Sequence, residues 1–220
     1  MRWRRGVPCV LGLALLACPR EAPVPDAGPG EFPVTSVPGT PLLWRLPATW
    51  TVAQHRPAGG GQAPSAAGTR VEDAGAPAKS ADLLAQTTLV AKGQRSTADR
   101  PSTLPPRVEV YVNGPLPKEA TISDYLVANR QAQARALGDI TVRHLEVEPI
   151  RRSGRAGFHL RDAFDVPLPQ GGQAPVSQQA VLLVDGERGY VIVVTLLEDE
   201  LSRHAEELRT WLHSIRFNTP

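Results

Sequence analysis

The chain has 220 residues, a length that suits one domain with extensions or two small domains. Its 22 prolines and 19 glycines exceed average usage and fall unevenly, which predicts segments without a packed core beside a folded part. The formal net charge is +2, and once the three N-terminal arginines are set aside, 21 basic residues face 22 acidic ones. No basic stripe remains to neutralise phosphates, so we expect no nucleic-acid partner.

Cysteine is confined to the N-terminus. Cys9 and Cys18 are the two cysteines of the whole sequence. A disulfide between residues nine positions apart in an apolar stretch is unfavourable, and two cysteines alone build no metal site. We therefore expect neither a disulfide nor a cysteine-bound metal.

The N-terminus has the features of an export signal. A positively charged start, MRWRR, precedes the apolar residues 6–17, a segment shorter than the ~20 residues that span a bilayer. The sequence LLAC at residues 15–18 then resembles the bacterial lipobox. That resemblance implies cleavage before Cys18, with Leu15 and Ala17 in the apolar and small pockets of the peptidase, and lipid attachment to Cys18. The alternatives are a plain secretory signal, cut near the same point, and an uncleaved anchor.

With a lipid on Cys18, the rest of the chain is expected to consist of a tether and a folded domain held at a membrane. Two or three acyl chains anchor a protein stably, so the membrane is an expected partner. Residues 18–40 are rich in proline with few large apolar side chains, which predicts a disordered tether. We expect a signal peptide over residues 1–17 and one folded domain over 41–220. Because no aspartate follows Cys18, we place the protein at the outer membrane, facing the periplasm.

The folded part begins with a region rich in tryptophan. Residues 41–52, PLLWRLPATWTV, read as strand with a bend at Pro47. Residues 56–82 are then low in complexity. One tryptophan-rich strand cannot form a core alone, so we interpret this segment as an insertion within the domain rather than a linker between domains.

Regular elements follow the insertion. Residues 87–92 and 107–114 are rich in β-branched side chains and predict strands. Residues 121–137 predict a helix with Thr121 or Ser123 as its N-cap.

The second half predicts four strands in two hairpins. Residues 140–148 and 155–166 alternate apolar and polar side chains around a turn at Ser153-Gly154. Residues 178–197 hold two apolar runs around the turn sequence DGER. A closing helix over 199–217 carries an apolar stripe: Leu201, Ala205, Leu208, Leu212 and Ile215.

These elements predict an α+β fold. The runs AVLLV and YVIVVTLL are apolar on both faces, so both faces of the central sheet must be covered, and two amphipathic helices are present to cover them. We expect an α/β/α sandwich around a mainly antiparallel sheet. The stretches LWRLPATWTV, SDYLVANRQ, GFHLRDAF, GYVIVVTLLEDE and LRTWLHSIRF, in this order, resemble the PsbP-like sandwich, which includes the DcrB and LpqN types of lipoprotein. The resemblance covers about residues 42–217 and implies a non-catalytic, partner-binding role.

One polar cluster raises the question of a metal. His144, Glu146 and Glu148 alternate on one predicted strand, and His159 and Arg161 lie on the next, so a zinc site is one interpretation. The other is a solvated sheet face. The predicted turn places Glu148 opposite His159 and Glu146 opposite Arg161, as cross-strand charge pairs of a fraction of a kcal/mol each. We favour the charge pairs and predict no metal site.

The remaining polar residues also lack a catalytic pattern. His204 and His213, with Glu206 and Glu207, are not spaced as HExxH, and we expect a solvated helix face. The acidic residues 198–200 open a helix, where the macrodipole favours them. The sequence holds no GxSxG, no SxxK and no phosphate-binding loop, so we predict no catalytic residue and no cofactor. Three tryptophans are expected in the core: Trp44, Trp50 and Trp211.

The sequence thus predicts a membrane-anchored, non-catalytic lipoprotein of the cell envelope, with a monomeric domain that binds or stabilises an envelope protein. A carrier of small ligands in a cavity between sheet and helix is the first alternative, and a large apolar pocket would favour it. A hydrolase or metalloenzyme is the second, and it requires His144, Glu148 and His159 to converge.

Overall fold

The computed structural model describes residues 33–55, 83–84, 86–95, 104–168 and 171–218. The predicted signal peptide, the lipobox residues Leu15, Ala17 and Cys18, and the predicted insertion lie outside the described residues. Within the described ranges, no helix is both long and apolar enough to cross a membrane.

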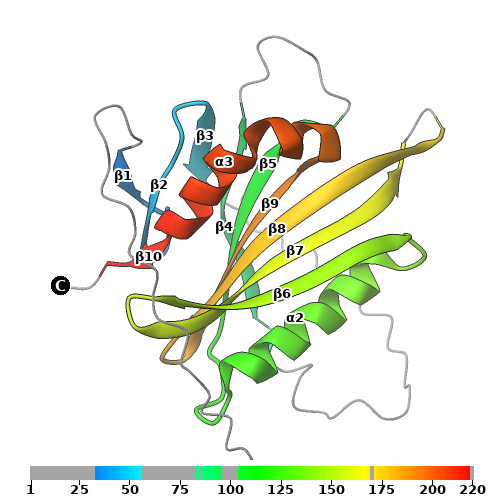
Figure 1. Cartoon of the computed structure of the whole chain (residues 1–220). Helices are drawn as coiled ribbons and strands as arrows, with labels where there is room; N and C mark the ends of the chain where they lie inside the picture. The colour runs from blue at the N-terminus through cyan, green and yellow to red at the C-terminus, as the bar shows by residue number, and fades with distance from the viewer. Residues whose placement is uncertain (1–32, 56–82, 85, 96–103, 169–170, 219–220) are drawn as a thin grey trace, which may run out of the picture.

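A large antiparallel sheet forms the centre of the molecule (Figure 1). Every neighbouring pair in it is antiparallel. Its seven strands, in spatial order, are β3 (Trp50–Gln54), β4 (Thr87–Arg95), β5 (Arg107–Asn113), β9 (Arg188–Leu197), β8 (Gln173–Asp185), β7 (Arg155–Pro167) and β6 (Val142–Arg152). The two hairpins predicted for the second half of the chain are confirmed as β6–β7 and β8–β9.

A small second sheet corrects the predicted start of the domain. It consists of β1 (Val34–Ser36), β2 (Leu42–Arg45) and β10 (Arg216–Phe217), in the order β1-β2-β10. The domain therefore begins before residue 41, and the last part of the predicted tether is folded. The physical reason is pairing of β1 with β2 together with burial of Val37 in the core.

Helix α2 (Ile122–Leu137) begins where the sequence predicts. The Thr121 hydroxyl accepts from the backbone N–H of Asp124, and the Asp124 carboxylate accepts from the backbone N–H of Thr121. This reciprocal pair is a capping box, which satisfies two N–H groups that the helix start would otherwise leave without partners.

Helix α3 (Glu198–Ser214) ends earlier than predicted. Ile215 is extended, and Arg216 and Phe217 pair with β2 instead of continuing the helix. The predicted stripe is also wrong at Ala205, which is exposed, whereas Trp211 is fully buried.

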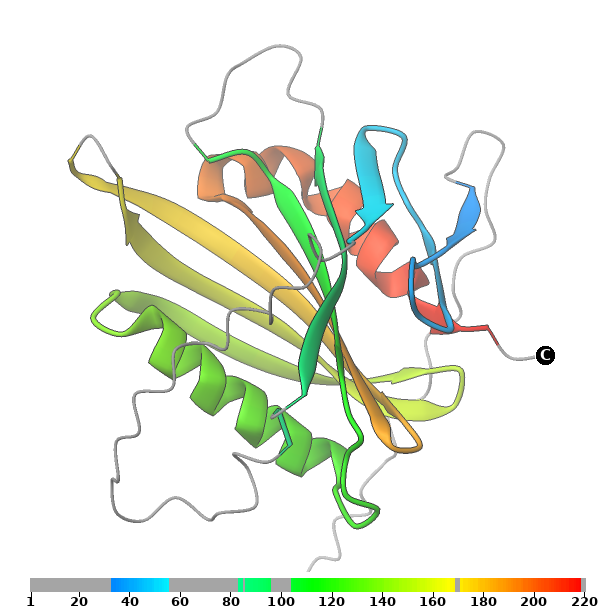
Figure 2. The ribbon, with the colours of Figure 1, turned by 180° about the vertical axis from the view of Figure 1, so that it is seen from behind.

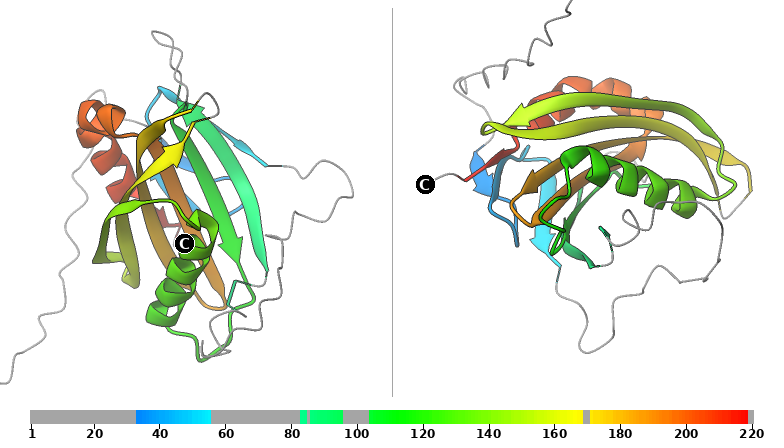
Figure 3. Two further views of the ribbon diagram at one scale, coloured as in Figure 1. Left: turned by 90° about the vertical axis from the view of Figure 1, so that its right-hand side faces the viewer. Right: turned by 90° about the horizontal axis from the view of Figure 1, so that it is seen from below.

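The two helices cover opposite faces of the large sheet, as Figure 3 shows from below. The α3 side holds the larger core, in which the rings of Trp44 and Trp50 lie 5.4 and 4.9 Å from that of Trp211. The α2 side holds a smaller core around Tyr125 and Leu182. Seen from behind in Figure 2, the small sheet lies beside α3. The predicted α/β/α sandwich and the core positions of the three tryptophans are confirmed.

Candidate functional site

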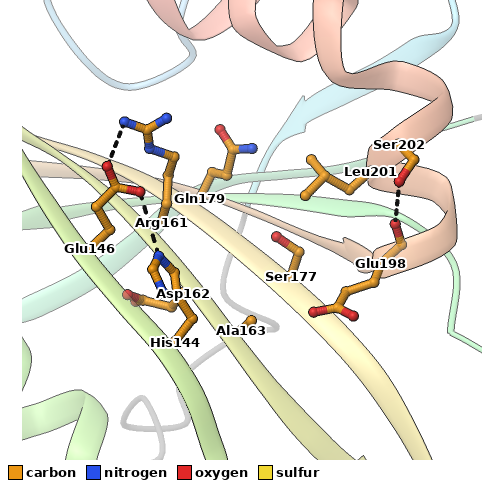
Figure 4. A pocket seen from close by; sticks show the side chains of 10 residues that line it. All are labelled: His144, Glu146, Arg161, Asp162, Ala163, Ser177, Gln179, Glu198, Leu201 and Ser202. Carbon is orange, nitrogen blue, oxygen red and sulfur yellow. Dashed lines mark hydrogen bonds and ion pairs between the residues drawn. The ribbon is translucent and has the colours of Figure 1, made fainter.

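A polar groove lies between the start of α3 and strands β6, β7 and β8 (Figure 4). Its cavity volume is about 320 Å³. Ten residues line it: His144, Glu146, Arg161, Asp162, Ala163, Ser177, Gln179, Glu198, Leu201 and Ser202.

The strand register explains why the groove exists. Ala163 pairs with Ser177, and Arg161 pairs with Gln179, so these four side chains share the sheet face that α3 covers. Ala163 and Ser177 are small and leave space between the sheet and Leu201 of α3.

Asp162 borders the groove through its backbone, because its side chain lies on the opposite face of β7. Its carboxylate accepts from Arg130 at 2.5 Å and from Gln133 at 2.7 Å, both on α2. Gln133 also donates to Gln178 at 3.0 Å. Sequence reasoning missed this buried network. A signal was present, because Asp162 interrupts the apolar alternation of Leu160 and Phe164.

The outer wall of the groove is a charge network. Arg161 donates to Glu146 at 3.0 Å and to Glu148 at 2.8 Å. His144 Nε2 lies 3.5 Å from Glu146 Oε2. The predicted pairing of Glu146 with Arg161 and of Glu148 with His159 is confirmed by the register.

His159 departs from the predicted solvated face. It is 6% exposed, its Nε2 lies 3.2 Å from Gln179 Oε1, and its ring is 6.4 Å from that of His213 on α3. The prediction is wrong here because α3 extends over this part of the sheet. Burial, with a smaller effect of the Arg161 guanidinium, lowers the pKa of His159 and favours the neutral imidazole at pH 7.

The residues of the metal hypothesis are not assembled as ligands. The Arg161 guanidinium bridges Glu146 and Glu148. His144 is largely exposed at the sheet edge, while His159 is buried. In the part of the chain that the structure describes, no group of three or more His, Cys, Asp or Glu side chains could hold a metal ion.

Glu198 forms the opposite wall, at the first turn of α3. Its carboxylate accepts from the Arg143 guanidinium at 2.6 and 3.1 Å. The same guanidinium lies 2.9 Å from Asp165. Helix α3 is thereby tied to the edge of the sheet.

The rest of α3 is partly a solvated face and partly an anchor. Glu206 is exposed and pairs with Arg209, as expected. Glu207 departs from the prediction, because it accepts from Trp50 Nε1 at 3.2 Å and from the Thr49 hydroxyl at 3.3 Å.

Strand β6 also exposes apolar side chains, which sequence reasoning did not single out. Val142, Leu145 and Val147 are 39%, 54% and 42% exposed, and we call them the β6 apolar strip. Their register partners on β7 face α2, so the strip lies on the sheet face opposite the groove. β6 is the last strand of the sheet order.

Comparison with solved structures identifies the fold. The chain is similar to cyanobacterial PsbP (CyanoP) from Synechocystis sp. PCC 6803, with a TM-score of 0.52 and 12% identity over 87% of this chain and 95% of that one. The chain has a PsbP-like fold. LpqN of Mycobacterium tuberculosis, which is involved in cell envelope biogenesis, gives a TM-score of 0.47 and 11% identity over 81% of this chain and 83% of that one. No family model and no curated protein matches the chain.

This PsbP-like domain therefore presents two distinct surfaces. The groove offers carboxylates, a guanidinium, an amide and hydroxyls, which can hold a polar ligand by charge and hydrogen bonds. The β6 apolar strip exposes apolar surface, and a partner that covered this surface would gain binding free energy by removing it from water.

Proposed function

We propose that the chain is a lipid-anchored protein of the bacterial cell envelope, and that its PsbP-like domain binds a protein partner without catalysing a reaction. The lipobox resemblance at residues 15–18 supports the anchor, with lipid on Cys18. The domain would lie at the outer membrane, facing the periplasm.

The observation that carries the partner-binding proposal is the β6 apolar strip. Leu145 is 54% exposed on the last strand of the sheet, with Val142 and Val147 on the same face. Contiguous exposed apolar side chains mark interaction sites, and each Å² of apolar surface removed from water contributes about 25 cal/mol. Pro149 and the charged residues of β6 disfavour pairing with a second copy of the strand, so we propose a monomeric domain and a different protein as partner.

Affinity capture of the full chain from native membranes tests this proposal. Leu145→Glu places a charge in the strip and should remove the partner from the captured material. Val34→Glu is the matched control, because Val34 is an equally apolar strand residue, 44% exposed, on the small sheet. Loss of the partner with Val34→Glu as well, or its retention with Leu145→Glu, would contradict the proposed surface.

The anchor has its own test. Cys18→Ala should abolish uptake of labelled fatty acid and release the chain from the membrane fraction. If the variant still takes up the label, Cys18 is not the lipidated residue.

The alternative of a small-ligand carrier in a cavity between sheet and helix would be favoured by a large apolar pocket, whereas the groove is lined by charged and polar side chains together with Ala163 and Leu201. The alternative of a metalloenzyme or hydrolase requires His144, Glu148 and His159 to converge, and in the described chain Arg161 binds Glu148 while His144 is largely exposed. We therefore propose partner binding as the function of the domain.

A further inference from the structure

The floor of the groove holds a serine whose hydroxyl faces the groove. Ser177 is 5% exposed, and its hydroxyl makes no hydrogen bond within the described part of the chain. Figure 4 shows the hydroxyl oxygen directed into the space between Gln179 and Leu201. A hydroxyl can both donate and accept a hydrogen bond, so Ser177 can bond a polar group that enters the groove.

The amide of Gln179 adds a second hydrogen-bonding group beside Ser177. Its Oε1 lies 3.2 Å from the ring of the buried His159, which fixes the orientation of the side chain. The rest of the amide faces the groove. Ser177 and Gln179 stand two residues apart on β8, so both polar side chains face the same space, as in a pre-formed ligand site.

The charges around the groove favour a cation. Arg161 is shared by two carboxylates, at 3.0 and 2.8 Å, and Arg143 is shared by two more, at 2.6 and 2.9 Å. Two negative charges therefore remain in excess at the rim, and such a field raises the local concentration of cations. The four carboxylates belong to Glu146, Glu148, Asp165 and Glu198.

We propose that this groove binds a small organic cation, an alkylammonium or alkylguanidinium group, between Glu146 and Glu198, with a hydrogen bond to Ser177. The alkyl part lies against Ala163 and Leu201, which supply apolar contact. A volume of about 320 Å³ suits a short linear ligand. The site is on the sheet face opposite the β6 apolar strip and does not depend on the partner proposed there.

Titration calorimetry on the purified full chain tests the proposal with three probes. Agmatine carries a guanidinium and an ammonium, putrescine carries two ammonium groups, and glutarate is a dianion of similar length. Agmatine and putrescine should bind saturably and glutarate should not. A blocked Gly-Arg-Gly tripeptide distinguishes the source of the cation: if it binds as well as agmatine, the natural ligand is a basic side chain, and if it does not, the ligand is a free molecule.

Variants of the groove locate the site. Glu198→Gln should weaken agmatine binding at least about tenfold by removing a charge, Ser177→Ala should weaken it severalfold, and Ala163→Leu should block it by filling the space. Glu206→Gln is the matched control on the same helix, away from the groove, and should leave binding unchanged. Thermal melts of each variant confirm folding.

Three results would overturn the proposal. The first is no saturable binding of any cationic probe. The second is equal binding of glutarate. The third is agmatine binding that Glu198→Gln, Ser177→Ala and Ala163→Leu all leave unchanged.

Discussion

Gly189 positions helix α2 by having no side chain. The ring of Tyr125, which is fully buried, lies directly over it, and the Tyr125 hydroxyl donates to Asn113 Oδ1 on the neighbouring strand. A Cβ at Gly189 would overlap the tyrosine ring. Close approach of backbone and ring at this one position therefore sets how deeply α2 sits on the sheet.

Gly189→Ala should lower the free energy of unfolding by roughly 1–3 kcal/mol, because the added methyl group displaces the ring. Urea denaturation measures the change. In a Tyr125→Leu background the same substitution should cost less, since the smaller side chain leaves room. An equal cost in both backgrounds would show that the ring contact is not the cause.

His159 should make stability depend on pH. Burial lowers its pKa in the folded state, so below about pH 6.5 the unfolded chain takes up the proton first and folding becomes less favourable. Urea denaturation at pH 7.5 and 5.5 should show a larger loss of stability for the wild type than for His159→Gln. If both lose the same amount, His159 is not buried in its neutral form.

At the scale of elements, Glu207 joins α3 to β3. Its carboxylate accepts from Trp50 Nε1 and the Thr49 hydroxyl, and Arg95 Nε lies 3.7 Å away. Trp50 packs on Trp211, so this polar contact borders the larger core. The helix is thus fixed to the sheet by an acidic residue as well as by apolar packing.

Glu207→Ala should lower the unfolding free energy by about 1–2 kcal/mol, because it leaves the indole N–H without its acceptor. The neighbouring Glu206→Ala removes an exposed pair with Arg209 and should leave stability nearly unchanged. Urea denaturation curves give the unfolding free energies of the two variants. Equal losses in Glu207→Ala and Glu206→Ala would mean that the contact between Glu207 and Trp50 contributes little.

Short sequence patterns predicted the elements whose structure depends mainly on neighbouring residues. The helix start at Thr121 and the pairing of Glu146 with Arg161 follow from capping and hairpin geometry, which depend on few residues. The pairing of Arg216–Phe217 with β2 joins residues distant in sequence and so escaped prediction. Strand β1 pairs with the nearby β2, but its three residues are all exposed and show no alternation that would indicate a strand.

The candidate site was predictable only in part, for the same reason. The polar face of β6 and β7 was visible as alternation, so the Arg161 wall was expected. Ser177 and Glu198 come from β8 and α3, and no sequence spacing shows that they share a groove with it. The burial of His159 likewise depends on where α3 lies.

For the molecule as a whole, the two faces of the sheet carry separate surfaces. The β6 apolar strip lies on the α2 face and the groove on the α3 face. The proposed protein partner and the proposed small cation would therefore bind on opposite faces of the sheet.

Replacing residues 56–82 by a short glycine-serine linker should leave the melting temperature nearly unchanged, because the cost of closing a loop depends weakly on its length. Differential scanning calorimetry of the full chain and the shortened chain measures this. A drop of many degrees would mean that the segment contributes contacts to the fold.

The central claim, partner binding through the β6 apolar strip, is tested most directly by site-specific cross-linking in native membranes. A photo-crosslinking amino acid in place of Leu145 should give one discrete adduct with an envelope protein, and the same amino acid in place of Val34 should give none. Adducts of equal yield from both positions, or no adduct from position 145, would contradict the claim.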